Sequence, residues 1–247
     1  VNANYLILQD VDVSGGATFI SSNTYDLGNN TGWNITTATS RNLYYIGKQG
    51  KWGVPNSWSL SSGGSPTGCI PSPIDNVTFD ANAFASTKDT LFLDQTNNRC
   101  KSFSWLSTAA GSTIYSKPYQ KLEVFGNLLM NGDAINAMMG SVQFDGTTQG
   151  NTITSNRFKF TWLDFVNSGE WIVQDSLHVI GSENLFWEAL VLRAGTLNTN
   201  GKPIRTRRFT SYGDVKRKLI LGKTVVTISK SWEPAWYITG SNFHLDA

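Results

Sequence analysis

The chain has 247 residues, and its 20 basic residues nearly balance its 18 acidic ones, for a formal net charge of +2. This balance gives no global field that would recruit nucleic acid or an anionic membrane, so we expect no nucleic-acid partner. Charged residues make up only 15% of the chain, which favours turn-dense β structure over long surface helices. No apolar run reaches the roughly 18 residues that a membrane-spanning helix needs.

Residues 1–38 come first and are too short to hold a core of their own. Short strand-like runs in this segment are separated by a Gly/Asn-rich loop. We expect residues 1–38 to be the C-terminal end of a preceding β-helix module. Residues 39–247 would be the following module, truncated at its C-terminal end. The chain has no initiator Met and no signal segment, so we interpret it as a piece of a longer protein.

The second module opens with a Trp/Gly/Pro-rich segment at residues 44–85, called the opening segment below. Glycines and prolines break any regular element there, and Trp52 and Trp58 lie close together in a loop-rich sequence. A Gly/Ser/Pro run follows before Cys69. Nothing in the segment has the form of a catalytic signature.

The chain has two cysteines, Cys69 and Cys100. A cysteine pair in a Gly/Asn-rich β protein predicts an oxidising compartment and one disulfide, with two free buried thiols as the alternative. The bond would close a ring of about 32 residues and stabilise the fold by roughly 3–4 kcal/mol. Neither His178 nor His244 lies near a cysteine in the sequence, which argues against a metal site built on these residues.

From residue 77 onward, short β-type runs recur and are separated by Gly, Asn, Asp or Ser. Their spacing predicts an all-β fold but leaves sandwich, barrel and solenoid open. Residues 190–204 alternate strand, Gly-Thr, strand, Asn-Gly, strand, which is typical of the coils of a parallel β-helix. We therefore predict a right-handed parallel β-helix, a solenoid. Residues 133–139 are the best helix candidate, with a Met pair that fills a gap in the packing.

The opening segment resembles the start of a repeat module in very large cell-surface proteins of the Bacteroidota, the SprB-like gliding adhesins. That module begins Y-W-V-G-G-x-G-x-W-x-x-P-x-x-W-S-x-x-S-G-G and continues to P-x-x-x-D-x-V-x-F-D. The matching residues are Gly47, Gly50, Trp52, Pro55, Trp58, Ser59, Ser62, Gly63, Gly64, Pro71, Asp75, Val77, Phe79 and Asp80. The chain departs from the pattern at Tyr45, Lys48 and Lys51.

Further parts of the chain are similar to the same module. Cys100, Lys101 and Trp105 match a C-K-x-x-x-W context. Residues 195–202 match G-T-L-x-T-N-G-K, and residues 219–228 match L-x-L-G-x-x-x-V-x-I. Residues 14–36 look like the end of such a module, so the resemblance covers most of the chain.

The resemblance implies a non-catalytic repeat module of an exported cell-surface adhesin, active in gliding motility and surface attachment as a stiff stalk. Its implied partners are the type IX secretion and gliding machinery, adjacent modules of the same chain and a surface polysaccharide. The implied location is the extracellular cell surface, associated with the outer membrane. The alternative is a carbohydrate-active β-helix, similar to a polysaccharide lyase or a glycosidase, or a lectin module.

Acidic residues supply two kinds of candidate site. Asp75 and Asp80 are candidate calcium ligands, although no compact run of acidic ligands is present and we predict no required cofactor. Asp164, Glu170 and Asp175 would align across coils of a β-helix as a catalytic carboxylate pair. The competing interpretation is that these carboxylates cap turns or lie in solvent.

Aromatic and basic residues supply candidate binding surfaces. Trp171, Trp187, Trp232 and Trp236 are candidates for stacking on sugars, against the alternative of core packing. The basic stretch formed by Arg205, Arg207, Arg208, Lys216, Arg217 and Lys218 would form one patch for an anionic polysaccharide if its two strands stack, against the alternative of a solvated outer face.

Modification and serine-type catalysis are the last candidates. Asp89-Thr90-Leu91 and Asp175-Ser176-Leu177 are similar to the O-glycosylation acceptor of the Bacteroidota, which makes Thr90 and Ser176 candidate glycan sites. Asn29, Asn34 and Asn76 stand in N-x-S/T sequons, but that pathway is not expected in such a host. His178 and His244 have no nucleophile elbow beside them, so we set Ser-His-Asp catalysis aside.

Overall fold

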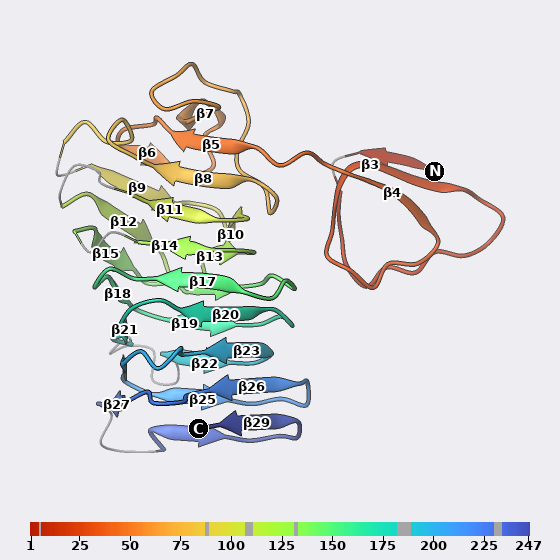
Figure 1. Ribbon diagram of the computed structural model, residues 1–247. Coiled ribbons are helices and arrows are strands. Elements are labelled where there is room, and N and C mark those ends of the chain that lie inside the picture. The colour runs from red at the N-terminus through yellow and green to blue at the C-terminus, as the bar shows by residue number, and fades with distance from the viewer. Residues whose placement is uncertain (5, 87–88, 107–110, 131–132, 182–188, 230–233) are drawn as a thin grey trace.

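The computed structural model describes residues 1–247 except 5, 87–88, 107–110, 131–132, 182–188 and 230–233. Nearly all regular structure in the described residues is β, and the one helical element among them is the 3-10 turn η1 (Pro55–Ser57). Parallel strands stack into a β-solenoid of about seven turns (Figure 1). The predicted all-β fold and stacked-coil architecture are therefore confirmed. No helix in the described part of the chain is long and apolar enough to cross a membrane.

Each coil of the solenoid contributes one strand to each of three sides. The first side is a ten-stranded sheet, which consists in spatial order of β29 (Phe243–Asp246), β26 (Arg217–Ile220), β23 (Gly195–Asn198), β20 (Glu170–Val173), β17 (Asn151–Thr154), β14 (Leu128–Leu129), β11 (Phe103–Trp105), β8 (Asn76–Phe79), β5 (Asn42–Tyr45) and β7 (Trp58–Ser59).

The second side is a seven-stranded sheet of β10 (Asn97–Cys100), β13 (Lys121–Val124), β16 (Val142–Phe144), β19 (Leu163–Phe165), β22 (Leu190–Leu192), β25 (Phe209–Ser211) and β28 (Trp236–Ile238). The third side is divided into two four-stranded sheets. One holds β15 (Ile135–Met138), β12 (Thr113–Ser116), β9 (Thr90–Leu93) and β6 (Gly50–Lys51), and the other holds β18 (Lys159–Phe160), β21 (Leu177–Val179), β24 (Ile204–Thr206) and β27 (Val226–Ile228).

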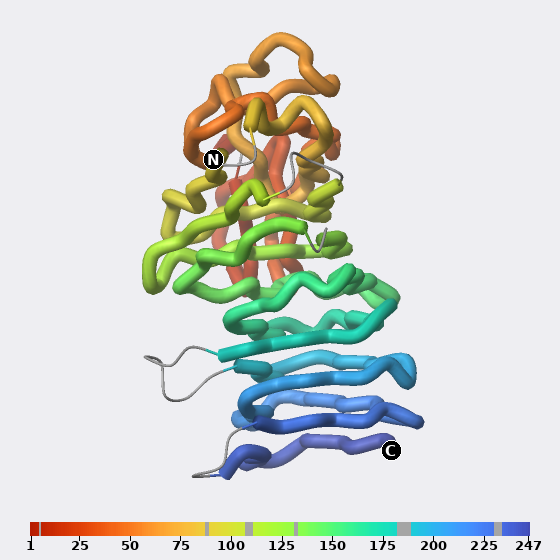
Figure 2. Tube along the Cα trace, turned by 90° about the vertical axis from the view of Figure 1, so that its left-hand side faces the viewer, coloured from red at the N-terminus to blue at the C-terminus, as the bar shows by residue number. Residues whose placement is uncertain are grey.

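Residues 1–38 form a small parallel sheet of their own beside the first coils (Figure 1, Figure 2). Its strands are β1 (Asn2–Asn4), β2 (Ile7–Leu8), β3 (Phe19–Asp26) and β4 (Trp33–Thr37). Among the described residues, an edge-to-face pair between Tyr25 and Phe125 joins this sheet to the solenoid, with ring centroids 5.6 Å apart. That residues 1–38 end a preceding module stays a prediction.

The core lies between the three sides, where residues of one register position stack on each other coil after coil. In the seven-stranded sheet the inward stack runs Cys100, Val124, Phe144, Phe165, Leu192 and Ser211, all buried. Alternate residues of each strand point outward, which is the period of two that a half-buried strand requires. Burial of such stacks is the main favourable term in the folding of the solenoid.

The opening segment closes the first end of the solenoid. The antiparallel strand β7 pairs with β5 and covers the edge of the ten-stranded sheet. Behind it, the buried rings of Trp52 and Trp58 pack 4.9 Å apart, and the Trp58 indole N–H donates to the Trp52 carbonyl at 2.9 Å. Tyr45 and Phe79 contact Trp58 from the coils below. At this end the edge of the ten-stranded sheet is therefore paired, and the core is covered by aromatic rings.

The helix predicted at residues 133–139 is wrong, because residues 135–138 form β15, which pairs in parallel with β12. Backbone pairing to the preceding coil outweighs the weak helical preference of this short stretch. Met138 is buried in the core, as the packing interpretation requires, whereas Met139 is exposed.

Replacing Trp58 by Ala should destabilise the solenoid by about 3–5 kcal/mol, because it removes a fully buried ring from the end cluster. Urea unfolding followed by circular dichroism would measure the change. Leu60→Ala, at an exposed position two residues away, is the matched control and should change stability by less than about 0.5 kcal/mol. An equal midpoint for the Trp58 variant and the native chain would contradict the end-closing role.

Candidate functional site

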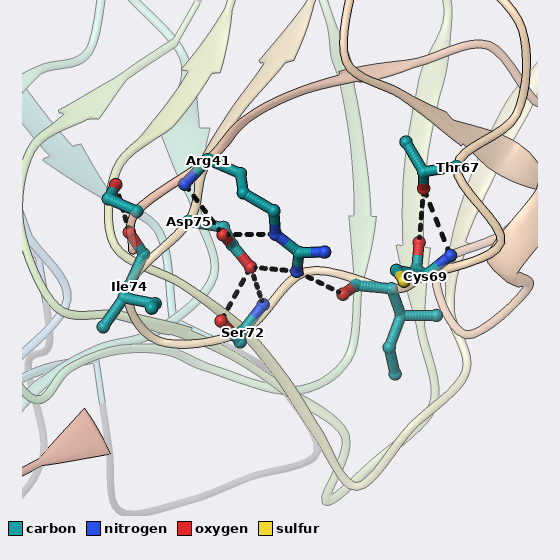
Figure 3. Close-up of polar contacts among 8 residues, drawn as sticks. Arg41, Thr67, Cys69, Ser72, Ile74 and Asp75 are labelled. Atoms are coloured by element: carbon teal, nitrogen blue, oxygen red, sulfur yellow. Dashed lines mark hydrogen bonds and ion pairs between the residues drawn. The ribbon is translucent and has the colours of Figure 1, made fainter. Parts of the chain in front are cut away.

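The best-defined polar cluster surrounds Asp75, just before β8 (Figure 3). Its carboxylate accepts from the Arg41 backbone N–H at 3.0 Å and from the Arg41 guanidinium at 2.9 and 2.6 Å. The backbone N–H and hydroxyl of Ser72 donate to the same carboxylate at 2.9 and 2.7 Å. The Asp75 side chain is fully buried and Arg41 is one-third exposed. The cluster fastens the strand that starts the solenoid to the turn that precedes β8.

Burial alone would raise the pKa of Asp75, but the hydrogen bonds from Arg41 and Ser72 outweigh it and hold the pKa below its ordinary value. The five donors occupy the carboxylate oxygens that a calcium ion would need. Asp80 lies at the other end of β8 and accepts from the Asn82 backbone N–H at 2.9 Å. Asp75 and Asp80 therefore act in this structure as local acceptors, and they do not converge on one point.

The two cysteines lie on either side of this cluster. Cys69 is exposed and interacts with the Arg41 guanidinium, whereas Cys100 is buried in the core stack. Burial, and then the charge of Asp75, raises the pKa of the Cys100 thiol well above its ordinary value. Both residues are free thiols in the structure, so the predicted disulfide is not formed. Cys100 instead fills an apolar position beneath Val124.

The two tryptophan candidates that the structure describes, Trp171 and Trp236, do not form a sugar-binding surface. Trp171 is fully buried, donates to the Gly126 carbonyl at 3.1 Å and packs on Phe144. Its ring is unavailable to a glycan, so the prediction that Trp171 binds sugar is wrong. Trp236 is partly buried and packs on Phe209 with ring centroids 4.4 Å apart, an inward position in the last strand of its sheet. Trp187 and Trp232 lie outside the described residues.

The predicted carboxylate set does not come together. Asp164 lies on the outer face of the seven-stranded sheet, and Glu170 lies on the ten-stranded sheet. Asp175 lies in the turn before β21, where it accepts from the backbone N–H groups and hydroxyl of Ser155 and Asn156. The three residues are neighbours in sequence but belong to different sides of the coil, so they supply no catalytic pair.

The predicted basic patch is also divided. Arg205 in β24 points outward on the third side, whereas β26 belongs to the ten-stranded sheet. Arg217 is fully buried and donates to the carbonyls of Thr239 and Ser241 at 3.0 and 2.5 Å. Lys218 pairs with Asp246 at 3.4 Å. The two strands do not stack, so the stretch is no single surface.

The glycan-acceptor candidates lie at different exposures. Ser176 is exposed in the turn before β21, and Thr90 is partly buried at the start of β9. An exposed turn hydroxyl is accessible to a transferase, so modification of Ser176 stays a prediction that the structure accommodates. His178 and His244 lie on different sides of the solenoid, on β21 and β29.

The outer face of the seven-stranded sheet is a candidate functional surface that sequence reasoning missed. Register places Arg99, Glu123, Gln143 and Asp164 in one outward row, from successive coils. Arg99 donates to Glu123 at 2.7 Å, and Lys121 donates to Gln143 at 2.9 Å. Charged and amide groups on successive coils are therefore held in fixed positions by each other. The only sequence signal was a polar residue in mid-strand once per coil.

A cavity of about 360 Å³ opens on this face. Arg193 donates to both carboxylate oxygens of Asp164 at 2.8 and 2.9 Å and lies over the ring of Tyr212 at 4.6 Å. Aromatic residues border it, and Tyr119 is 86% exposed. Rings beside fixed hydrogen-bonding groups are suited to a sugar or another small polar ligand. The residues that line the cavity include Tyr119, Lys121, Gln143, Trp162, Asp164 and Arg193.

Asp145 lies in the next outward row of the same face. Burial, and then the charge of Glu123, raises the pKa of Asp145 to about 6. Asn167 donates to this carboxylate at 3.4 Å. Burial together with Asp145 also raises the pKa of Tyr25, from residues 1–38, to about 12. A carboxylate that titrates near neutrality is a feature of acid–base sites, and also of crowded structural charges.

Comparison with known proteins gives no match: no family model, curated protein or solved structure is similar to this chain.

Substitution of Asp75 by Ala should destabilise the fold by about 2–3 kcal/mol at pH 7, because the donors of Ser72 and Arg41 lose their acceptor. The loss is not larger because the partly exposed Arg41 side chain can turn toward solvent. Asp80→Ala is the control. It removes the hydrogen bond that the Asp80 carboxylate accepts from the Asn82 backbone N–H and should destabilise the fold by about 1 kcal/mol or less. The pKa of Asp75 is lowered on folding, so its contribution is present above about pH 4 and is lost as pH falls through the folded-state pKa. Equal stabilities of the two variants in urea would contradict the role of the cluster.

Asp145→Asn should stabilise the chain at pH 7 by about 1–2 kcal/mol. The pKa of Asp145 is higher in the folded state, at about 6, than the ordinary unfolded value of about 4. The folded state therefore binds the proton more tightly, and its stability falls as pH rises between these values. Urea unfolding at pH 5 and pH 7 measures the effect, with the exposed Asp12→Asn as control. A native chain whose stability does not fall over this range would contradict the shift.

Proposed function

We propose that the chain is a non-catalytic repeat module of an exported cell-surface adhesin, which acts as a stiff stalk in gliding motility and surface attachment. The observation that carries this proposal is the continuous parallel pairing of successive coils along the ten-stranded and seven-stranded sheets. Successive coils are hydrogen-bonded along these two sheets, and along the third side within each of its two four-stranded sheets. The interior is one stack of apolar side chains. Such an array resists bending and adds length with every coil.

The cellular role in this proposal rests on the resemblance of the opening segment to the Bacteroidota module. Trp52, Trp58 and Phe79, three residues of that motif, form the aromatic cluster that closes the first end of the solenoid. A motif that closes a solenoid is needed once per module, which supports a chain built from several modules. Its partners would then be adjacent modules, the type IX secretion and gliding machinery, and a surface polysaccharide, at the extracellular face of the outer membrane.

Pulling single molecules of the full chain from its two ends tests the stalk function. We expect resistance followed by release in steps of about one coil of extended chain, because each coil must break its pairing with the next. The Trp58→Ala variant should weaken the first coils and leave later steps unchanged. Release of the whole chain in one low-force event would overturn the stalk proposal.

A second candidate, a carbohydrate-binding or carbohydrate-cleaving β-helix, is favoured by the cavity on the seven-stranded sheet. The cavity joins exposed Tyr119 to the Asp164–Arg193 pair, and the indole N–H of Trp162 has no hydrogen-bond partner among the described residues. Asp145 has a pKa of about 6, which is close to the pKa that a general acid or base needs near neutral pH. Formation of shortened glycan products by the native chain, and not by Asp145→Asn, would select this candidate over the stalk.

A further inference from the structure

A ladder of positive charge runs along the third side of the solenoid. Parallel pairing places Lys159 of β18 opposite His178 of β21, and His178 opposite Arg205 of β24. All three side chains point outward, with Lys159 and Arg205 exposed and His178 half-buried. We call Lys159, His178 and Arg205 the cationic ladder. Its members come from three successive coils, so they are about 4.8 Å apart along the solenoid axis.

The cationic ladder takes part in no ion pair among the described residues. Those ion pairs lie elsewhere, and none includes Lys159, His178 or Arg205. Arg157 precedes β18 and Arg207 follows β24, and both add further positive charge to the same side. Asp175 is the nearest carboxylate in sequence, and Ser155 and Asn156 already donate to it.

Like charges directly opposite each other in a sheet destabilise it. Burial, and then the charges of Lys159 and Arg205, lowers the pKa of His178. A charged His178 would therefore lie directly between two cations, which would destabilise the sheet. A polyanion bound over this row would offset that repulsion.

We propose that the cationic ladder binds a linear acidic polysaccharide that lies along the solenoid axis. The geometry favours a polymer over a single anion, because Lys159 and Arg205 lie two coils apart on the same side, with His178 between them. The outward neighbours on these strands and their flanking turns are Ser176, Ile180, Pro203, Val225 and Thr227. None of these described neighbours is aromatic, so they offer no rings on which nucleic-acid bases would stack. The position of the site follows from the register of the strands. Only the choice of a polysaccharide as the ligand rests on the proposed adhesive function.

Binding of polygalacturonate, a carboxylate polymer, and of dextran sulfate to the full chain at low salt tests the proposal, with uncharged dextran as the neutral probe. The double variant Lys159→Gln/Arg205→Gln should bind the acidic polymers at least about tenfold more weakly than the native chain. Lys117→Gln, an exposed lysine in the turn between β12 and β13, is the matched control and should bind like the native chain. Equal binding by the double variant and the native chain would overturn the assignment.

The two histidines supply an independent readout, because the chain contains only His178 and His244. In an NMR titration, saturating polygalacturonate should raise the pKa of His178, since the polymer's charge favours the imidazolium form. His244, on β29 of the ten-stranded sheet, should not change. No shift at His178, or the same shift at both rings, would place the polymer elsewhere and contradict the proposal.

A competition with single-stranded DNA separates the two classes of polyanion. Displacement of the polysaccharide by DNA at equal charge concentration would overturn the choice of ligand class. These outcomes are separate from those of the pulling experiment, because a stiff chain that binds no polymer would retain the stalk function and lose only the cationic ladder.

Discussion

The register of coil on coil is the constraint on which every other feature of this structure depends. Parallel pairing fixes which residue of one coil lies above which residue of the next, and a shift of one residue would turn every core side chain to the outside. The stack from Cys100 through Phe144 to Leu192 exists only in this register. The same register sets the outer rows, so the core and both candidate surfaces are specified together.

The fold could be predicted from the sequence because its signals are local. Short β runs, turn residues and the cadence of residues 190–204 indicate stacked coils without knowledge of which coils touch. The helix predicted at residues 133–139 failed for the converse reason. The strand β15 owes its conformation to pairing with β12, which no local pattern reports. The disulfide prediction failed similarly, since cysteine count says nothing of the core position that Cys100 occupies.

Surfaces were harder to predict, because neighbours in sequence and neighbours in space differ in a solenoid. Arg205 and Arg217 are close in the chain but belong to different sides, and Arg217 is buried. Lys159, His178 and Arg205 are far apart in the chain yet adjacent in register. Coil lengths vary, since Ile153 pairs with Val173 whereas Val77 pairs with Phe103. Without an exact repeat, the sequence does not show which residues align across coils.

The three sides carry their charges in different ways, and this difference bears on function. On the seven-stranded sheet, Arg99 with Glu123 and Arg193 with Asp164 form fixed pairs that neutralise each other. Around Asp75 the carboxylate is saturated by donors and fastens the start of the solenoid. Such paired charges stabilise geometry but leave little net field.

The third side is different, because Lys159 and Arg205 are exposed and take part in no ion pair among the described residues. They lie on either side of His178, and burial, together with their charges, lowers the pKa of this histidine. Since this arrangement lowers the stability of the sheet and contributes nothing to the core, stiffness alone does not explain it. A solenoid fixes such charges at a constant spacing along a rigid axis, which a flexible chain of the same composition would not do. Rigidity and recognition are therefore two consequences of one register in this molecule.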